Sequence, residues 1–390
     1  MTSAEHIIGA NAERARSHNR QMVLDRVRQA GRIGRAEIAR GSGLSTQAVS
    51  NIIADLLADG LISEKGRRVG TKGQPPVQYG LNPGGGFAVG VEVRPDAVFA
   101  AMLDLCGTLV ASTRFDLSAT DLPGVTRTVV QARDDVVRQS QVPADRIFGA
   151  GIVMPGPFGR TGLSGLGSEL PIFHDISPRE WFEDALGVPV VVENDANASA
   201  IAERVSGAAQ GLRTYAFLYF GNGLGLGAVQ NGRLMTGALG NAGEIGHIPV
   251  PCGGRVVPLE TVLSRLSIQR HLQAAGIAVD SSEGLARAYD AQESVLMEWL
   301  AAASEPLTSA VATIENMLDP ETVILGGAMP DCILDHLIDA AQLSDRSVAC
   351  RPARTFPRLM RGASGRMTAT LGAAALVIHR AFTPRIGVAA

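Results

Sequence analysis

The chain has 390 residues, 46% of them hydrophobic, which is too long for one ordinary core and indicates two or three domains. No apolar run reaches the length of a membrane span, and the first 20 residues are polar and charged, so we expect a cytoplasmic protein with no membrane partner. The net charge of −3 is unevenly distributed: residues 1–82 carry 12 Lys and Arg against 7 Asp and Glu, whereas the remainder carries 23 against 31, and a basic amino-terminal module favours a polyanionic partner.

Three short helices are predicted near the start of the chain. Apolar residues at helical spacing predict a first helix over 19–30 and a second over 35–40, and the turn Gly41–Leu44 precedes a third helix that Ser45 is placed to cap. This order is typical of a helix-turn-helix, whose third helix enters the major groove of DNA. We therefore expect base contacts from the exposed face of the third helix, which carries Ser45, Thr46, Gln47, Ser50 and Asn51.

A basic segment over 65–79 then resembles a β-wing. Its Arg67, Arg68 and Lys72 are expected to contact phosphate or enter the minor groove. The alternative interpretation is a three-helix packing module with a basic loop. A break rich in Gly and Pro over 81–86 predicts a domain boundary, so we assign residues 1–82 to a winged helix-turn-helix DNA-binding domain and its linker.

Beyond this break, strands and helices are predicted in two sets. The first set has strands at 87–92, 97–104, 108–115, 147–153 and 188–192 and helices at 124–140 and 178–186. The second has strands at 215–220, 228–230 and 322–325, a Gly-rich turn at 221–227, and a last helix at 368–382. Two such sets predict α/β lobes with a cleft between them, which we place at 83–200 with 366–382 and at 201–365.

One stretch of the first set is suited to ligand binding. The β-branched strand Val190–Val192 breaks into polar residues and then runs into an Ala-rich helix over 198–204. Ligands of open α/β sheets lie beyond the carboxyl ends of strands, so Asn194 and Asp195 are expected in a crevice, where an Asp can orient or deprotonate a sugar hydroxyl. The alternative is that one of the two simply caps the following helix.

Five motifs in a fixed order carry a resemblance to a known family: Glu193–Asn197, Gly221–Gly225, Asn231–Arg233, Gly243–His247 and Leu259–Glu260. Behind a winged helix-turn-helix, this set resembles the ROK family of repressors, open reading frames and sugar kinases. The resemblance covers about residues 19–382 and implies a two-lobed, actin-like or ribonuclease H-like sugar-kinase fold.

The same resemblance implies a sugar in the cleft between the lobes. The residues matched to sugar binding are Asn194, Asp195, Glu244, His247 and Glu260. Carboxylates and an amide satisfy vicinal hydroxyls and reject ligands that leave buried acceptors unpaired. In the family's kinases the residue matching Asp195 is the general base. Without the family, His247 would be interpreted as an ordinary structural histidine.

Two departures from the family pattern bear on function. Family kinases carry an Asp-x-Gly-Gly-Thr turn that lets backbone N–H groups approach ATP phosphates, but here the turn reads Glu92-Val93-Arg94-Pro95-Asp96. Many members also hold zinc with one His and three Cys. This chain has Cys252, but Val250 and Pro258 stand where further cysteines would fall, and its four cysteines form no CxxC pair. We therefore expect no catalysis, no cofactor and no metal.

These features predict a sugar-responsive transcriptional regulator, with repression as the expected mode. Its expected partners are operator DNA, a small-molecule sugar and further copies of itself in a homodimer or homotetramer. The enzyme alternative is an ATP-dependent hexose kinase with Asp195 as base and an appended DNA-binding domain. A third alternative is a DNA-binding protein controlled by a protein partner, with no sugar in the cleft.

Overall fold

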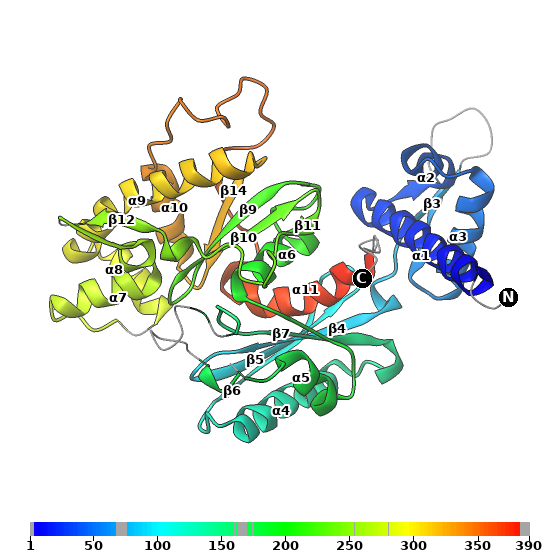
Figure 1. The fold of residues 1–390 in the computed structure, drawn as a ribbon, viewed down its shortest axis with the longest axis horizontal. Coiled ribbons are helices and arrows are strands. Elements are labelled where there is room, and N and C mark those ends of the chain that lie inside the picture. Colours follow the sequence, from blue (N-terminus) through cyan, green and yellow to red (C-terminus); the bar gives the residue numbers. More distant parts are fainter. Residues whose placement is uncertain are drawn as a thin grey trace.

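The computed structural model describes residues 4–67, 76–159, 161, 170–173, 175–252, 254–279 and 281–382. A helical head at the amino-terminal end stands beside a larger body built on two five-stranded sheets (Figure 1). In the described residues, no helix is long and apolar enough to cross a membrane.

The head comprises elements α1 to β3. Its helices are α1 (Ala4–Ala30), α2 (Arg35–Ser42) and α3 (Thr46–Ala58), and its strands are β1 (Ile33–Gly34), β2 (Ile62–Arg67) and β3 (Val77–Leu81). The strands form one antiparallel sheet in the order β1-β3-β2. Val27, Ile38 and Ile53 are fully buried between the helices, so apolar residues of α1, α2 and α3 together form the core of the head.

Local chemistry determines how the helices of the head begin and end. Ser45 caps α3 as predicted, because its side chain accepts a hydrogen bond from the backbone N–H of Ala48. Gly43 ends α2 with a φ of 72°, in the left-handed region where glycine is favoured. The predicted bounds were too short in two places: α1 begins at Ala4 rather than residue 19, and α2 includes Gly41 and Ser42. The part of α1 before Gln21 lacks the apolar spacing by which the rest of the helix was predicted.

The first sheet of the body has the order β6-β5-β4-β7-β8, antiparallel from β6 to β4 and parallel from β4 to β8. Helices α4 and α5 lie on its outer face (Figure 1). The elements are β4 (Phe87–Val93), β5 (Ala97–Asp104), β6 (Leu109–Asp116), β7 (Ile147–Val153), β8 (Val190–Glu193), α4 (Leu122–Ser140) and α5 (Pro178–Leu186), with short 3-10 turns η1 (Pro83–Gly85), η2 (Ala144–Arg146) and η3 (Pro171–Phe173).

The second sheet has the order β11-β10-β9-β14-β15 and is covered on its outer side by a group of four helices. Its strands are β9 (Tyr215–Phe220), β10 (Leu224–Gln230), β11 (Arg233–Leu234), β14 (Val323–Gly327) and β15 (Leu359–Arg361). The covering helices are α7 (Arg265–Ala274), α8 (Ser282–Asp290), α9 (Ser294–Leu318) and α10 (Asp331–Ala340). Between β11 and α7 lie η4 (Ile245–His247), the hairpin of β12 (Pro249–Cys252) and β13 (Arg255–Pro258), and η5 (Leu259–Thr261), while η6 (Gly365–Met367) follows β15.

Two helices rich in small residues lie between the sheets: α6 (Asp195–Ser206) and α11 (Thr368–Phe382) (Figure 1). Helix α6 packs on β9 and β10 of the second sheet, and α11 packs on β4 and β7 of the first. They approach each other so closely that a Cβ at Gly372 would lie 2.2 Å from the carbonyl oxygen of Ala198. Side chains larger than hydrogen do not fit there, so α6 and α11 form one tightly packed central layer.

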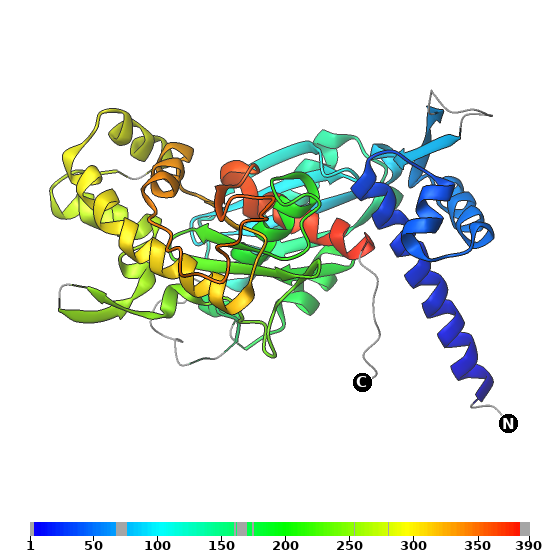
Figure 2. The same cartoon turned by 90° about the horizontal axis from the view of Figure 1, so that it is seen from above.

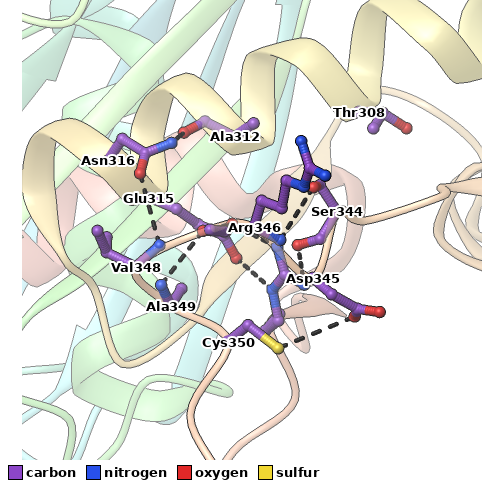
Figure 3. A network of polar contacts seen from close by, with 12 residues as sticks. Thr308, Ala312, Glu315, Asn316, Ser344, Asp345, Arg346, Val348, Ala349 and Cys350 are labelled. Carbon is purple, nitrogen blue, oxygen red and sulfur yellow. Dashed lines mark hydrogen bonds and ion pairs between the residues drawn. The ribbon is translucent and has the colours of Figure 1, made fainter.

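The segment between α10 and β15 is held on α9 by a buried carboxylate. Glu315 accepts hydrogen bonds from Arg358 Nη2 and from Ser347 Oγ, both at 2.6 Å. Figure 3 shows how this segment, with Ser344 to Cys350, runs past Glu315 and Asn316 of α9. Burial alone would raise the pKa of Glu315, but the hydrogen bonds from Arg358 and Ser347 outweigh it and hold that pKa below its usual value.

Several predicted bounds in the body differ from the structure by one or two residues, and three further differences involve a helix cap or glycines. The helix predicted from residue 198 begins at Asp195, because the polar cap of its first turn was excluded from the apolar pattern. The Gly-rich segment predicted as a turn is half strand, since Leu224–Gly227 belongs to β10. Gly326 and Gly327, which the predicted strand 322–325 left out, lie within β14, which pairs with β9 over its whole length. In these strands Gly provides room for neighbouring chain segments rather than a turn.

Candidate functional site

A cleft of about 440 Å³ opens between the two lobes, and all five predicted sugar residues line it. That volume lies within the range of small-molecule sites. Asn194 and Asp195 enter from the junction of β8 and α6, Glu244 and His247 from η4, and Glu260 from η5. The cleft therefore brings together residues that lie up to 66 positions apart in the chain.

Asn194 is both a helix cap and a residue of the cleft, the two roles that the sequence left open as alternatives. Its Oδ1 accepts a hydrogen bond from the backbone N–H of Asn197 at 2.8 Å, which caps α6, and the same side chain lines the cleft. Asp195 follows as the first residue of α6, and its Oδ1 accepts from the N–H of Ala196. The amino-terminal end of α6 therefore faces the ligand space, where its dipole stabilises the Asp195 carboxylate.

His247 lies between two carboxylates on the opposite wall. Its Nε2 is 3.7 Å from Glu244 Oε2, and its Nδ1 is 4.0 Å from Glu260 Oε1. Burial raises the pKa of Glu244; His247 opposes this rise and the negative charge of Glu260 adds to it. The wall thus offers carboxylate oxygens and an imidazole to a ligand rich in hydroxyl groups.

Glycines make room for Glu260. A Cβ at Gly223 would lie 2.4 Å from Glu260 Oε2, and one at Gly246 would lie 3.0 Å from the same atom. The backbone N–H of Leu224 donates to this oxygen at 3.4 Å. The Gly-rich segment therefore positions a carboxylate in the cleft.

Other residues of the cleft were not predicted as ligand residues. Pro155, Gly156 and Pro157 form part of the wall contributed by the first lobe, and Tyr219 and Arg270 line the wall contributed by the second. The first three follow the carboxyl end of β7, so the rule that predicted Asn194 applied equally to them. Tyr219 gave no such signal because it lies inside a continuous apolar strand.

The turn Glu92–Asp96 differs from the phosphate-binding turn of the family kinases, and its Arg94 side chain packs within the turn and its neighbouring strand. Arg94 Nε donates to Glu92 Oε1 at 2.6 Å, and the guanidinium lies 4.4 Å from the centre of the Phe99 ring. Burial alone would lower the pKa of Arg94, but the charge of Glu92 and the hydrogen bond to it, with smaller contributions from Tyr219 and Asp96, together raise that pKa. Pro95 has no N–H, so the residues at this turn do not fit a nucleotide phosphate group.

Val250 and Pro258, which stand where zinc-binding family members have cysteines, lie on the hairpin of β12 and β13. Val250 pairs with Val257 across β12 and β13, and Pro249 pairs with Pro258. Val250 is buried in the core of the second lobe, and neither it nor Pro258 offers a metal ligand. In the part of the chain that the structure describes, no cluster of three or more His, Cys, Asp or Glu side chains is arranged to hold a metal ion. The residues present therefore do not fit a zinc ion with one His and three Cys.

The predicted DNA-contacting face of α3 is exposed. Thr46, Gln47 and Asn51 are exposed and Ser50 is half-buried, while Ser45 caps the helix. Gln47 Nε2 donates to Asn51 Oδ1 at 3.1 Å, which aligns the two amides along one face. Arg67 is exposed at the end of β2, whereas Arg68 and Lys72 lie outside the described residues.

The head contacts the body at the far ends of the two central helices. Arg28 of α1 hydrogen-bonds to Asp25 at 2.7 Å, donates to the carbonyl oxygen of Arg204 at 3.4 Å, and lies 5.7 Å from the centre of the Phe382 ring. Burial and the neighbouring charges of Arg204 and Arg28 lower the pKa of His379 to about 3, so this histidine is neutral at physiological pH. Helix α6 therefore joins the cleft at its first residue to the head at Arg204 in its last turn, about 14 Å away at 1.5 Å per residue.

Comparisons with known proteins agree with this division of the chain. Residues 16–63 match the family model for winged helix-turn-helix DNA-binding domains, and residues 88–380 match the model of the ROK family. An uncharacterized protein of Sinorhizobium fredii, y4fQ, is 30% identical over 314 residues, which are 79% of this chain and 77% of that protein. The xylose repressor of Bacillus spizizenii is 27% identical over 238 residues, covering 60% of this chain and 61% of the repressor.

Solved structures share the fold. A ROK family transcriptional regulator described as a homologue of the E. coli MLC protein superposes with a TM-score of 0.72 at 23% identity, covering 95% of this chain and 97% of that one. The ROK hexokinase of Thermus thermophilus superposes with a TM-score of 0.56 at 26% identity, covering 74% and 97%. The sugar-kinase-like body with its amino-terminal winged helix-turn-helix is therefore confirmed as the fold. The chain belongs to the ROK family.

Proposed function

We propose that this protein is a sugar-responsive, DNA-binding transcriptional repressor of carbohydrate-metabolism genes. One observation carries the proposal: helix α6 connects the cleft that the five predicted sugar residues line to the winged helix-turn-helix head. The similarity to the xylose repressor supports the sugar as effector and repression as the mode.

The sugar is proposed to lie between Asn194 and Asp195 on one side and Glu244, His247 and Glu260 on the other. Carboxylates accept hydrogen bonds from vicinal hydroxyls, and an analogue without those hydroxyls leaves buried acceptors unpaired. Because three carboxylates line the cleft, an uncharged sugar is favoured over a sugar phosphate.

We propose further that the body transfers no phosphoryl group. Phosphoryl transfer depends on positioning and charge stabilisation, and the turn that would cradle the phosphates carries Arg94 and Pro95 in place of two glycines. The alternative is an ATP-dependent hexose kinase. Two observations support it: Asp195 lies in the cleft, and the fold is shared with the Thermus hexokinase. Sugar-dependent ADP release that Asp195→Asn abolishes would establish that alternative.

The proposed mechanism is a change in the angle between the lobes. A sugar that binds one angle better than the other shifts the population towards it, whereas equal affinity for both shifts nothing. In a homodimer or homotetramer, a new lobe angle changes the spacing of two heads and hence their fit to two half-sites on DNA. Solution scattering that finds a monomer at working concentration would contradict this mechanism.

Thermal unfolding against a ligand panel tests the proposal directly. The panel contains xylose, glucose, polyols and sugar phosphates, each with and without ATP. A ligand at about 100 times its dissociation constant stabilises the folded body by roughly 2.7 kcal/mol, which raises the melting temperature. We expect a rise with an uncharged sugar and none with ATP. A rise that requires ATP would favour the kinase, and no response to any ligand would favour control by a protein partner.

A further inference from the structure

One contact joins the two walls of the cleft at its edge. Asn241 Oδ1 accepts a hydrogen bond from the backbone N–H of Phe158 at 2.8 Å, and Asn241 Nδ2 donates to the carbonyl oxygen of Phe158 at 3.0 Å. A single amide thereby satisfies both backbone groups of one residue, 83 positions away in the chain. We call this pair of hydrogen bonds the clasp.

The two sides of the clasp belong to different lobes. The Phe158 ring packs against the core of the first lobe, next to the wall Pro155–Pro157. The segment of Asn241 is fixed to the second lobe, because the carbonyl oxygen of Gly243 accepts a hydrogen bond from the N–H of Leu226 in β10. Motion of one lobe against the other therefore has to break the clasp or carry one of these segments along.

The clasp also lies beside the residues proposed to bind the sugar. Asn241 is three residues before Glu244, and a Cβ at Gly156 would lie 3.3 Å from Glu244 Oε1. With the clasp formed, the Pro155–Pro157 wall is held against the carboxylate that receives the ligand. When the clasp opens, water satisfies all four polar groups, so the closed arrangement is favoured only modestly and remains reversible.

From this geometry we propose that Asn241 is a positioning residue that holds the cleft closed over its ligand. The inference rests on the proposed sugar site and adds a residue that does not itself line the cleft. Without the clasp, the closed, binding-competent population falls, and the observed sugar affinity falls by the same factor. Bound sugar also leaves faster, because the wall over it is no longer fixed.

Two substitutions separate the clasp from simple packing. Asn241→Ala removes both hydrogen bonds. Asn241→Asp keeps the shape of the side chain but replaces the donor Nδ2 by a carboxylate oxygen. A carboxylate cannot donate a hydrogen bond to the carbonyl oxygen of Phe158, so this half of the clasp is lost. A packing role would tolerate the Asp variant, whereas the clasp would not. Asn316→Ala is the matched control, since the Asn316 amide also uses both its groups, donating to the carbonyl oxygen of Ala312 and accepting from the N–H of Val348, and none of these residues lines the cleft.

The experiment measures the affinity of the full chain for xylose and glucose by calorimetry, and the hydrogen exchange of the Phe158 amide. We expect both Asn241 variants to bind the sugar roughly tenfold more weakly than the parent and the Asn316 control, with faster exchange at Phe158. Affinity of either Asn241 variant within twofold of the parent, or unchanged exchange, would overturn the clasp. A parent that binds neither sugar would count against the proposed sugar site instead, and the exchange rate at Phe158 would then decide for or against the clasp alone.

Discussion

Gln47 and Asn51 hydrogen-bond to each other on the exposed face of α3, and each carries an amide that suits an adenine edge. Replacing Gln47 by Ala should therefore cost roughly 1–3 kcal/mol of discrimination at one base pair. Arg67→Ala should instead weaken binding to all sequences alike and reduce the salt slope by about 1. Binding assays on a set of single-base operator variants at several salt concentrations measure both effects. Equal effects of the two substitutions would contradict the placement of α3 in the groove.

The raised pKa of Glu244 leads to a prediction of how sugar binding depends on pH. Because burial raises its pKa, the carboxyl takes up a proton at a higher pH than an ordinary Glu, and a protonated carboxyl has lost acceptor capacity for sugar hydroxyls. Sugar affinity should therefore fall as the pH is lowered through the range just above the usual pKa of Glu. Titration calorimetry at stepped pH values measures this fall. Glu244→Gln should bind more weakly at neutral pH and lose this part of the pH dependence. An unchanged profile in that variant would contradict the assignment of this pH dependence to Glu244.

At the scale of elements, the packing of α6 on α11 gives a direct stability prediction. Gly372→Ala places a Cβ about 2.2 Å from the carbonyl oxygen of Ala198, so the helices must separate. Overpacking of this kind destabilises by about 1–3 kcal/mol, measured as the free energy of unfolding in denaturant. Gly41→Ala in α2 is the control, because its Cβ would meet only the flexible end of Arg26. Equal stability of the Gly372 variant and the parent would contradict the close approach of α6 and α11.

Periodic elements could be predicted from the sequence, and contacts between distant segments could not. The strand β9 and the helix α11 were predicted with the residues that the structure gives, because their apolar patterns are continuous. Gly225 and Gly227 of β10 were interpreted as part of a turn, since their use, to leave room for α6, depends on a segment that packs there only in the fold. Asn241 was missed for the same reason: nothing near it in the chain indicates that Phe158 is its partner.

At the scale of the whole molecule, Arg28 connects the head to the helix that begins in the cleft. We expect Arg28→Ala to reduce the effect of sugar on DNA affinity, because the contacts with Arg204 and Phe382 are lost while the sugar and DNA residues remain. Arg26→Ala is the control, since Arg26 hydrogen-bonds within the head to the carbonyl oxygen of Gly41. DNA titrations with and without saturating sugar measure the ratio of affinities. A ratio as large in the Arg28 variant as in the parent would exclude this route.

The assignment of the domains stays a proposal at this scale: head and linker at 1–82, first lobe at 83–200 with 366–382, and second lobe at 201–365. Helix α6 packs on the second sheet, α11 packs on the first, and the two helices pack on each other, so neither lobe is expected to fold alone. We therefore expect the body to unfold as one cooperative unit. Coincident transitions of probes placed in the two sheets would agree with this expectation.

The most direct test of the account is the affinity of the full chain for its selected DNA site, titrated with and without the uncharged sugar that raises its melting temperature. We predict a change in DNA affinity of about 5- to 150-fold, the usual range for coupled sites, and the same factor in sugar affinity when DNA is bound. Asp195→Ala and Glu244→Ala should keep the DNA affinity measured without sugar and lose the response. A sugar that binds the body tightly and leaves DNA affinity unchanged would contradict a sugar-responsive repressor.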